Sequence, residues 1–171
     1  ALGGYLAPPS AQEKASGPDA RFCRTDTQES RRRPTLSAVV DSSVLVAALV
    51  DAGPHGAWAE GIIANGALVA PELARVEATN VLRRLERARR ISTPEANAAH
   101  EDLMQLDLQL LSFEPFADRI WELRHTITSY DAWYVAVAEA LALPLATLDE
   151  RLAKAQGPKC TFLTTGRAPM K

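Results

Sequence analysis

Four acidic residues stand next to predicted strands or in predicted helices. In an α/β fold, these positions would bring their carboxylates to one edge of the sheet. Asp41 directly follows the apolar run Ala38–Val40 and precedes a helical stretch, and Asp149 follows Leu145–Leu148 in the same way. An acid at such a junction can cap the next helix by accepting its backbone N–H groups, and capping alone would account for both residues. Each also lies at the carboxyl end of a strand, where open parallel sheets bind their ligands.

Two further acids belong to predicted helices. Asp131 lies in the first turn of its helix, where the helix dipole favours a negative charge. Glu77 stands four residues from both Leu73 and Val81, so its carboxylate shares the apolar face that should point to the interior. A carboxylate buried without a partner is costly or takes up a proton. Glu77 therefore needs a cation, a solvent-filled cleft or a donor, and Asn80 on the same side could supply the donor.

These four acids could converge on one cleft, which would have a defined chemistry. Two carboxylates about 4 Å apart repel by about 4 kcal/mol at an effective dielectric constant of about 20, so the cluster needs protons or divalent cations. Oxygen ligands alone select hard cations such as Mg²⁺ and Mn²⁺. One or two such ions can activate water and stabilise an in-line displacement at phosphorus. The acids therefore predict phosphodiester chemistry with Mg²⁺ or Mn²⁺ as the cofactor.

The elements that must position these acids alternate, from Ala38 onward, between short apolar runs and helical stretches. This alternation is typical of a mostly parallel sheet flanked by helices, so the predicted fold class is α/β. The five predicted strands are Ala38–Val40, Ala67–Ala70, Leu108–Ser112, Leu145–Leu148 and Cys160–Leu163. The predicted helices are Ser43–Val50, Ala57–Asn65, Pro71–Arg89, Pro94–Leu106, Pro115–His125, Asp131–Leu143 and Glu150–Gln156.

Three of these helices carry additional signals. In Pro71–Arg89 a proline opens the first turn, and the predicted apolar stripe consists of Leu73, Val76, Val81, Leu85 and Ala88. Thr93 is the expected cap of Pro94–Leu106. Asp131–Leu143 is almost wholly apolar and rich in alanine, which predicts a buried central helix whose Trp133 and Tyr134 belong to the core.

Composition limits the possible partners. The 171 residues suit one domain with a tail, and residues 1–37, rich in Pro, Ser and Gly, are the predicted flexible tail before a folded domain of residues 38–171. The chain has 19 basic and 21 acidic residues and a net charge of −2. Six basic and four acidic residues give the tail +2, which leaves −4 for the folded part. A nucleic acid held by overall positive charge is thereby excluded, and only a local patch could bind one.

The chain shows no signal for a membrane or for secretion. Its longest apolar runs fall far short of the roughly 20 residues that a membrane helix needs, and no secretory signal opens the sequence. We therefore expect a cytoplasmic protein. Cys23 and Cys160 lie far apart in the chain and are predicted to be free thiols.

Three segments resemble the PIN-domain ribonucleases, and most of all the VapC toxins of bacterial toxin-antitoxin pairs. These segments are VVDSSVLVAAL (Val39–Leu49), PELARVEATNVLRR (Pro71–Arg84) and YDAWYVAVAEALALPLATLDERL (Tyr130–Leu152). The resemblance covers residues 38 to about 166 and depends on the ordered set of four acids in matching strand and helix contexts. It implies a PIN-like three-layer sandwich with a central, mostly parallel sheet of about five strands.

The resemblance also implies an activity and a set of site residues. Residue by residue, the family's acidic metal-binding quartet falls on Asp41, Glu77, Asp131 and Asp149, and its small hydroxyl positions fall on Ser43 and Thr147. Such a toxin would be a Mg²⁺- or Mn²⁺-dependent endoribonuclease that cuts tRNA or rRNA to inhibit translation. A cognate VapB-like antitoxin would silence it, and it would form a homodimer. Residues 1–37 have no counterpart in such a toxin.

An arginine cluster at the end of the Glu77 helix is the predicted RNA-binding surface. Its members are Arg83, Arg84, Arg87, Arg89 and Arg90. The helix dipole and solvation favour arginines at a helix C-terminus without any ligand, so this prediction has an equally simple structural explanation. An acidic antitoxin segment could also use these side chains.

Two other functions stay open from the sequence. A Mg²⁺-dependent phosphatase or a phospho-receiver module would phosphorylate Asp41. Ser43 stands where haloacid dehalogenase-like phosphatases have a second Asp, and Leu145–Leu148 lacks the Lys of a receiver. A non-catalytic scaffolding domain would use the acids only as helix caps, and an inward-facing Glu77 disfavours that function.

Overall fold

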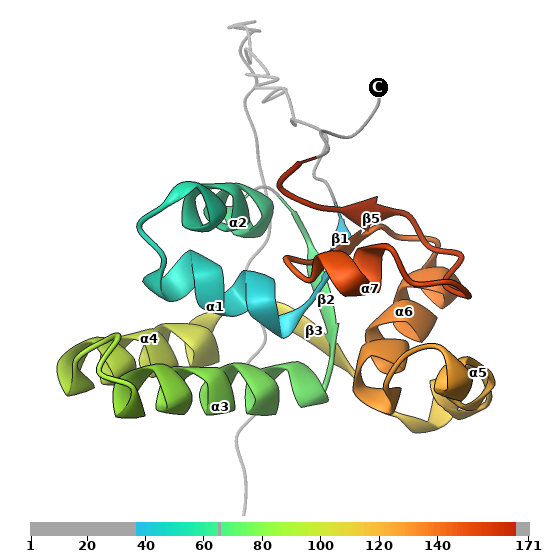
Figure 1. Cartoon of the computed structure of the whole chain (residues 1–171), viewed down its shortest axis with the longest axis horizontal. Helices are drawn as coiled ribbons and strands as arrows, with labels where there is room; N and C mark the ends of the chain where they lie inside the picture. Colours follow the sequence, from blue (N-terminus) through green and yellow to red (C-terminus); the bar gives the residue numbers. More distant parts are fainter. Residues whose placement is uncertain (1–36, 65, 167–171) are drawn as a thin grey trace, which may run out of the picture. The chain divides into compact units, whose positions relative to one another are not determined.

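A five-stranded parallel sheet forms the middle layer of the fold (Figure 1). The computed structural model describes residues 37–64 and 66–166, so residues 1–36 of the predicted tail lie outside the described residues. In spatial order the strands are β3 (Leu108–Leu111), β2 (Leu68–Pro71), β1 (Ala38–Val40), β4 (Leu145–Ala146) and β5 (Phe162–Leu163). Every neighbouring pair runs parallel. The predicted α/β class is confirmed.

Strand β1 occupies the centre of the sheet. Val39 is in register with Val69 of β2 on one side and with Leu145 of β4 on the other. All residues of β1 and β2 are buried. A parallel strand that is covered on both faces has no solvent-facing side, which explains why these strands are unbroken apolar runs.

Helices cover both faces of the sheet and complete the predicted three-layer sandwich. On one side lie α1 (Ser42–Val50), α2 (Pro54–Ala64), α3 (Leu73–Arg87) and α4 (Thr93–Gln105). On the other lie α5 (Ala117–Glu122), α6 (Ser129–Leu141) and α7 (Glu150–Ala153), with the 3₁₀ turns η1 (Glu114–Phe116) and η2 (Leu123–His125) flanking α5 (Figure 1). Over the described part of the chain, every helix is too short or too polar to cross a membrane.

Helix α6 is the central, buried helix that its composition predicted. It packs against β1 and β2, and its buried residues are Ala132, Tyr134, Val135, Ala136, Val137 and Ala138. Alanines at these positions let the helix backbone approach the sheet closely. Thr128 caps the start of the helix, which places Asp131 in its first turn. Trp133 is half-buried and packs edge-to-face on Phe113, with ring centroids 5.2 Å apart.

Helix α3 differs from its prediction in its start and in its buried face. Pro71 ends β2 instead of opening the helix, which begins two residues later. The buried residues of α3 are Ala74, Ala78 and Leu82, whereas Val76 is 66% exposed. The predicted stripe was wrong at Val76 and at Ala88, which is also exposed, whereas Val81 and Leu85 are partly buried and pack against the core. Close packing of α3 on its neighbours α1 and α4 also buries the small side chains of Ala74 and Ala78, which the stripe did not include.

Other corrections concern caps and ends. Ser92, not Thr93, caps α4, because its hydroxyl accepts the N–H of Glu95 while the Glu95 carboxylate accepts the Ser92 N–H in a capping box. The stretch 115–125, predicted as one helix, is divided among η1, α5 and η2. Strand β4 is shorter than predicted because the N–H groups of Leu148 and Asp149 donate to the hydroxyls of Ser43 and Thr147 instead of to a neighbouring strand. Helix α7 ends at Ala153 rather than at Gln156.

The start of α2 packs closely against the end of α1 at a glycine, Gly56, and this contact can be tested. A Cβ placed on Gly56 would lie 1.6 Å from the Asp51 carbonyl oxygen, whereas one on Gly61 of the same helix meets nothing within 4 Å. Gly56→Ala should therefore destabilise the protein by about 2 kcal/mol through overpacking. Gly61→Ala should stabilise it by about 0.5 kcal/mol, because alanine favours helix. Urea denaturation measures both, and equal stabilities of the two variants would contradict the packing.

Candidate functional site

Asp41 and Asp149 lie where the connections of the sheet diverge. Strands β1 and β4 are neighbours, but the chain leaves β1 into α1 on one side of the sheet and β4 into α7 on the other (Figure 1). Such a switch point opens a crevice beyond the carboxyl ends of the strands. As the sequence predicted, Asp41 is the N-cap of α1 and Asp149 is the N-cap of α7.

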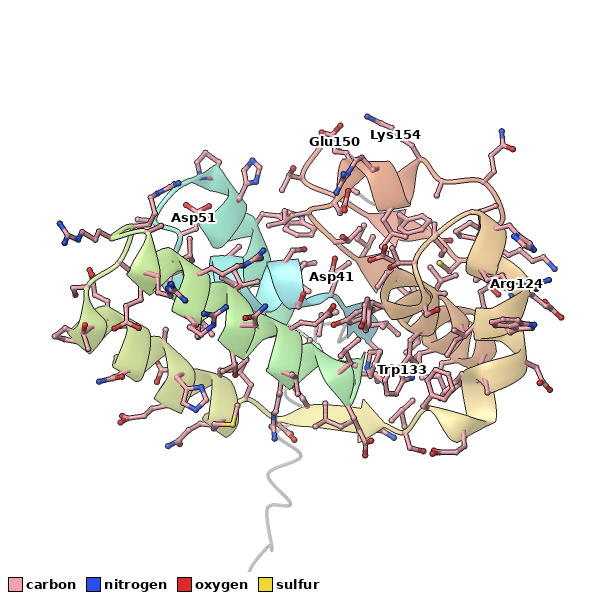
Figure 2. All side chains as sticks on the ribbon, turned by 60° about the horizontal axis from the view of Figure 1, so that its bottom comes forward. Asp41, Asp51, Arg124, Trp133, Glu150 and Lys154 are labelled. Carbon is pink, nitrogen blue, oxygen red and sulfur yellow. The ribbon has the colours of Figure 1, made fainter. Side chains whose placement is uncertain are left out.

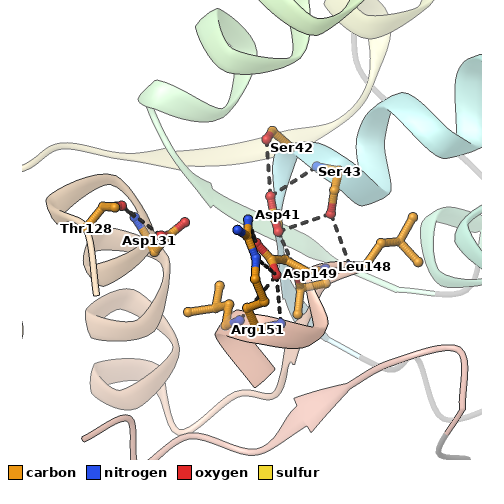
Figure 3. Close-up of polar contacts among 10 residues, drawn as sticks. Asp41, Ser42, Ser43, Thr128, Asp131, Leu148, Asp149 and Arg151 are labelled. Atoms are coloured by element: carbon orange, nitrogen blue, oxygen red, sulfur yellow. Dashed lines mark hydrogen bonds and ion pairs between the residues drawn. The ribbon is translucent and has the colours of Figure 1, made fainter. Parts of the chain in front are cut away.

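Asp41 is held by four neutral donors (Figure 3). Its Oδ1 accepts from the Ser42 hydroxyl at 3.1 Å and from the Ser43 N–H at 3.0 Å. Its Oδ2 accepts from the hydroxyls of Ser43 at 3.1 Å and Thr147 at 2.5 Å. The residue is 8% exposed. These contacts fix the orientation of the carboxylate, which lies near the centre of the view in Figure 2, and none of them brings a positive charge to it.

The hydroxyls of Ser43 and Thr147 also link the carboxyl ends of β1 and β4. Ser43 Oγ accepts the N–H of Leu148 at 3.1 Å, and Thr147 Oγ1 accepts the N–H of Asp149 at 2.9 Å. Each hydroxyl therefore donates to Asp41 and accepts from the chain that follows β4. This double role requires a small side chain with a hydroxyl, and it holds Asp41 and Asp149 in a fixed relation.

Glu77 reaches the site from the border of the buried face of α3. Its Oε2 accepts the hydroxyl of Tyr134 at 2.6 Å, and Tyr134 is 2% exposed on α6. Asn80, the predicted donor, instead accepts the Arg83 guanidinium at 3.0 Å, so that prediction was wrong. Tyr134 is buried, as predicted, but its contact with the site was missed. The signal was available, because Tyr134 stands three residues after Asp131 and therefore shares its helix face.

Asp131 faces the other carboxylates from the start of α6. The Thr128 hydroxyl donates to its Oδ2 at 2.7 Å and accepts its N–H at 3.1 Å. The carboxylate points toward Asp41 and Asp149, as Figure 3 shows. Acids from three different elements therefore meet beyond the same edge of the sheet.

Asp149, alone of the four acids, forms an ion pair with another described residue. Its Oδ1 accepts the N–H groups of Arg151 at 2.8 Å and Leu152 at 3.3 Å. The Arg151 guanidinium Nη2 lies 3.3 Å from Oδ2, and the Arg151 side chain is 94% exposed. An ion pair of this length at such exposure contributes little to stability.

The pKa values show that the acids act on one another. Burial raises the pKa of Glu77, and the nearby carboxylates of Asp41 and Asp131 raise it further. Burial likewise raises the pKa of Asp131, and Asp41 and Asp149 add to the increase. At Asp149 burial also acts to raise the pKa, but hydrogen bonds from Arg151 outweigh it and bring the value below its usual range. The four acids therefore form one electrostatic unit.

The donor set suits a hard divalent cation. Across residues 37–64 and 66–166, no three His, Cys, Asp or Glu side chains are close enough together to enclose a metal ion directly. Mg²⁺ usually keeps several water molecules and takes only one or two carboxylates plus phosphate oxygens of a substrate, so an open cluster fits it. Asp41, Glu77 and Asp131 have no ion-pair partner within the described residues, and this uncompensated charge attracts a cation.

The predicted arginine cluster lies away from these acids. Its five members, Arg83, Arg84, Arg87, Arg89 and Arg90, are all exposed, along and beyond the second half of α3. A helix rises about 1.5 Å per residue, so they begin about 9 Å along the axis from Glu77. Sequence analysis did not single out Arg124 and Arg151, which line a cavity of about 530 Å³ together with Asp131 and Asp149.

Comparison with known proteins agrees with the fold. The PIN domain family matches residues 38–158, and the chain belongs to this family. Within it, the chain is 38% identical over 123 residues to Ribonuclease VapC1 of Mycobacterium tuberculosis, an alignment that covers 71% of this chain and 92% of that relative.

Two solved structures share the fold at low identity. PAE2754 from Pyrobaculum aerophilum has a TM-score of 0.56 and 22% identity, with 83% of this chain and 92% of that chain covered. VapBC2 from Rickettsia felis, bound to a DNA fragment from its promoter, has a TM-score of 0.53 and 14% identity, with 75% of this chain and 98% of that chain covered. The PIN-domain resemblance seen in the sequence is confirmed.

The Thr147 hydroxyl allows a direct test of the link between β1 and β4. Thr147→Val keeps the shape of the side chain but leaves Asp41 one donor short and the Asp149 N–H without its acceptor. We expect a loss of about 2 kcal/mol in the free energy of unfolding. Thr147→Ser keeps the hydroxyl and should lose less. Urea denaturation measures the free energy of unfolding of both variants. A valine variant as stable as the parent would show that the link contributes nothing to stability.

Glu77 should destabilise the metal-free protein at neutral pH. Its pKa is higher in the folded than in the unfolded chain, so stability is lost as the pH rises through the folded value, and the penalty is absent below the ordinary value of 4.5. Glu77→Gln can still accept the Tyr134 hydroxyl. It should raise the Tm in EDTA at pH 7 by a few degrees, and the gain should vanish at about pH 4.

A matched control for this experiment is Asp102→Asn on α4, which removes one exposed carboxylate far from the site. It should leave the Tm unchanged at both pH values. A lower Tm for Glu77→Gln at pH 7 would contradict the repulsion among the acids.

Proposed function

We propose that this protein is a VapC-like endoribonuclease that uses Mg²⁺ or Mn²⁺ to cut tRNA or rRNA and thereby inhibits translation. The observation that carries the proposal is the electrostatic coupling of four carboxylates at the switch point of a PIN-domain sheet. The family supports it, because a relative at 38% identity is named a ribonuclease. A protein with these substrates acts in the cytoplasm.

The proposed roles follow the positions of the side chains. Asp41, Asp131 and Asp149 would hold the cation, one or two of them directly and the rest through its coordinated water molecules, and Glu77 would bind directly or through water. Such an ion, when bound, lowers the pKa of a coordinated water and neutralises charge that develops on the scissile phosphate. Ser43 and Thr147 orient Asp41, as Tyr134 orients Glu77. No protein nucleophile is needed in this mechanism.

The alternatives raised by the sequence have less support. A phosphatase or phospho-receiver would need an Asp41 oxygen free to attack phosphorus, but both oxygens already accept two hydrogen bonds each. A scaffolding domain would have no reason to bring together acids that raise one another's pKa. The nuclease accounts for both observations.

The expected partners are RNA and a VapB-like antitoxin. VapBC2 of Rickettsia felis has this fold, and its name pairs a VapC with a VapB. We propose the same kind of partnership here, in which the antitoxin silences the nuclease. The homodimer implied by the family resemblance stays a prediction.

The decisive experiment incubates the purified full chain with total RNA and Mg²⁺. The parent should release discrete fragments, and Asp131→Asn should reduce the rate by more than about 100-fold, because it removes a ligand charge without changing the shape of the side chain. Asp102→Asn, with the same loss of charge on α4, should cut as fast as the parent. Intact RNA with both the parent and Asp131→Asn would refute the proposed function.

Metal binding provides a second readout that does not depend on cleavage. Mn²⁺ should raise the Tm of the parent, because a ligand that binds only the folded state stabilises it. Asp41→Asn should abolish the rise. An unchanged parent Tm in Mn²⁺ would favour the scaffolding function instead.

A further inference from the structure

A cavity opens beside the acids, between η2, the start of α6 and α7. Its volume is about 530 Å³, and it is open to solvent on one side. Two acids of the site, Asp131 and Asp149, form part of its wall, and Arg124 and Arg151 form another part. Two arginines and two of the carboxylates therefore line the same hollow.

Arg124 is held in place but has no carboxylate partner within the described residues. Its Nη1 donates to the Trp121 carbonyl oxygen at 2.7 Å, and its guanidinium carbon lies 4.7 Å from the centroid of the Trp121 ring. The hydrogen bond and the cation–π contact fix the orientation of the guanidinium, and neither neutralises its positive charge with an anion. Several of its N–H groups stay available for an anion.

The guanidinium of Arg151 is nearly as free as that of Arg124 to bind an anion. Among the residues that the structure describes, its guanidinium bonds to Asp149 alone, at 3.3 and 3.5 Å, and its side chain projects into solvent. A divalent cation at Asp149 would compete with Arg151 for the same carboxylate. The arginine would then be free to bind an anion in the cavity.

We propose that this cavity binds the ribonucleotide adjacent to the scissile phosphate, with its phosphodiester group held by Arg124 and Arg151. This inference rests on the proposed ribonuclease function and names a subsite for its substrate. Guanidinium groups match phosphate oxygens in paired hydrogen bonds, which favours a nucleotide over an uncharged ligand. A volume of about 530 Å³ accommodates one nucleotide.

The positions of the arginines also suggest that two groups of them contact different phosphates of the RNA. Those at the end of α3 begin about 9 Å from Glu77 and could reach only more distant phosphates. Arg124 and Arg151 share a cavity with two of the acids, so they are placed for the phosphate next to the one that is cut.

The test measures kcat and KM on a short synthetic RNA trimmed to the cleavage site that the parent defines. Arg124→Gln and Arg151→Gln should each raise KM about tenfold with little change in kcat, because each removes one charged hydrogen-bonding partner. In binding measurements, each variant should also reduce the dependence of log affinity on log salt by about 0.7. Lys154, directly after α7, does not line the cavity, so Lys154→Gln, which loses the same charge, should match the parent.

Mn²⁺ titration separates this inference from the proposed function. Arg124→Gln should show the same rise in Tm as the parent, and Arg151→Gln should bind Mn²⁺ at least as tightly, because a competing cation is gone. If the parent cuts RNA and both variants keep its KM and salt dependence, the subsite is wrong and the nuclease stands. A fall in kcat without a change in KM would also overturn the subsite. A parent that neither binds Mn²⁺ nor cuts RNA would refute both.

Discussion

Repulsion among four carboxylates is the interaction that the rest of this molecule must accommodate. Folding gathers Asp41, Glu77, Asp131 and Asp149 beyond one edge of a sheet, where burial and, to a smaller extent, the charges of neighbouring acids raise the pKa of Glu77 and Asp131. The fold tolerates the repulsion by surrounding these oxygens mainly with neutral hydroxyl and N–H donors. Such donors fix each carboxylate but leave most of its charge in place. The fold therefore preserves the local charge that a hard cation requires.

The apolar framework explains how such a cluster can be kept together. Strand β1 is wholly buried at the centre of the sheet, and α6 packs against it through alanines and valines. Three of the acids occupy the starts of helices, where the backbone itself offers donors, and the fourth contacts a buried tyrosine. The site is thus carried by regular elements rather than by long loops, which limits how far the carboxylates can move apart.

The strands and the positions of the acids could be predicted because they depend on short stretches of sequence. An unbroken apolar run followed by an acid and a helix, as at Asp41, identifies a buried strand and the residue at its carboxyl end. The features that escaped prediction depend on packing between elements. The buried face of α3 is set by close contact through Ala74 and Ala78, which hydrophobicity alone ranks below Val76. Helix spacing puts Tyr134 on the same face as Asp131, but its hydrogen bond to Glu77 joins two helices and becomes visible only after those helices have been placed.

The hydrogen bond between Thr147 and Asp41 spans 106 positions of the chain. A polypeptide still emerging from the ribosome cannot make it until β4 has left the exit tunnel and inserted beside β1. Closing so long a loop is a late event, because its entropic cost must be met by contacts that form earlier. A nascent chain that lacks β4 therefore has no complete carboxylate cluster, so the site can form only after Asp149 has left the ribosome.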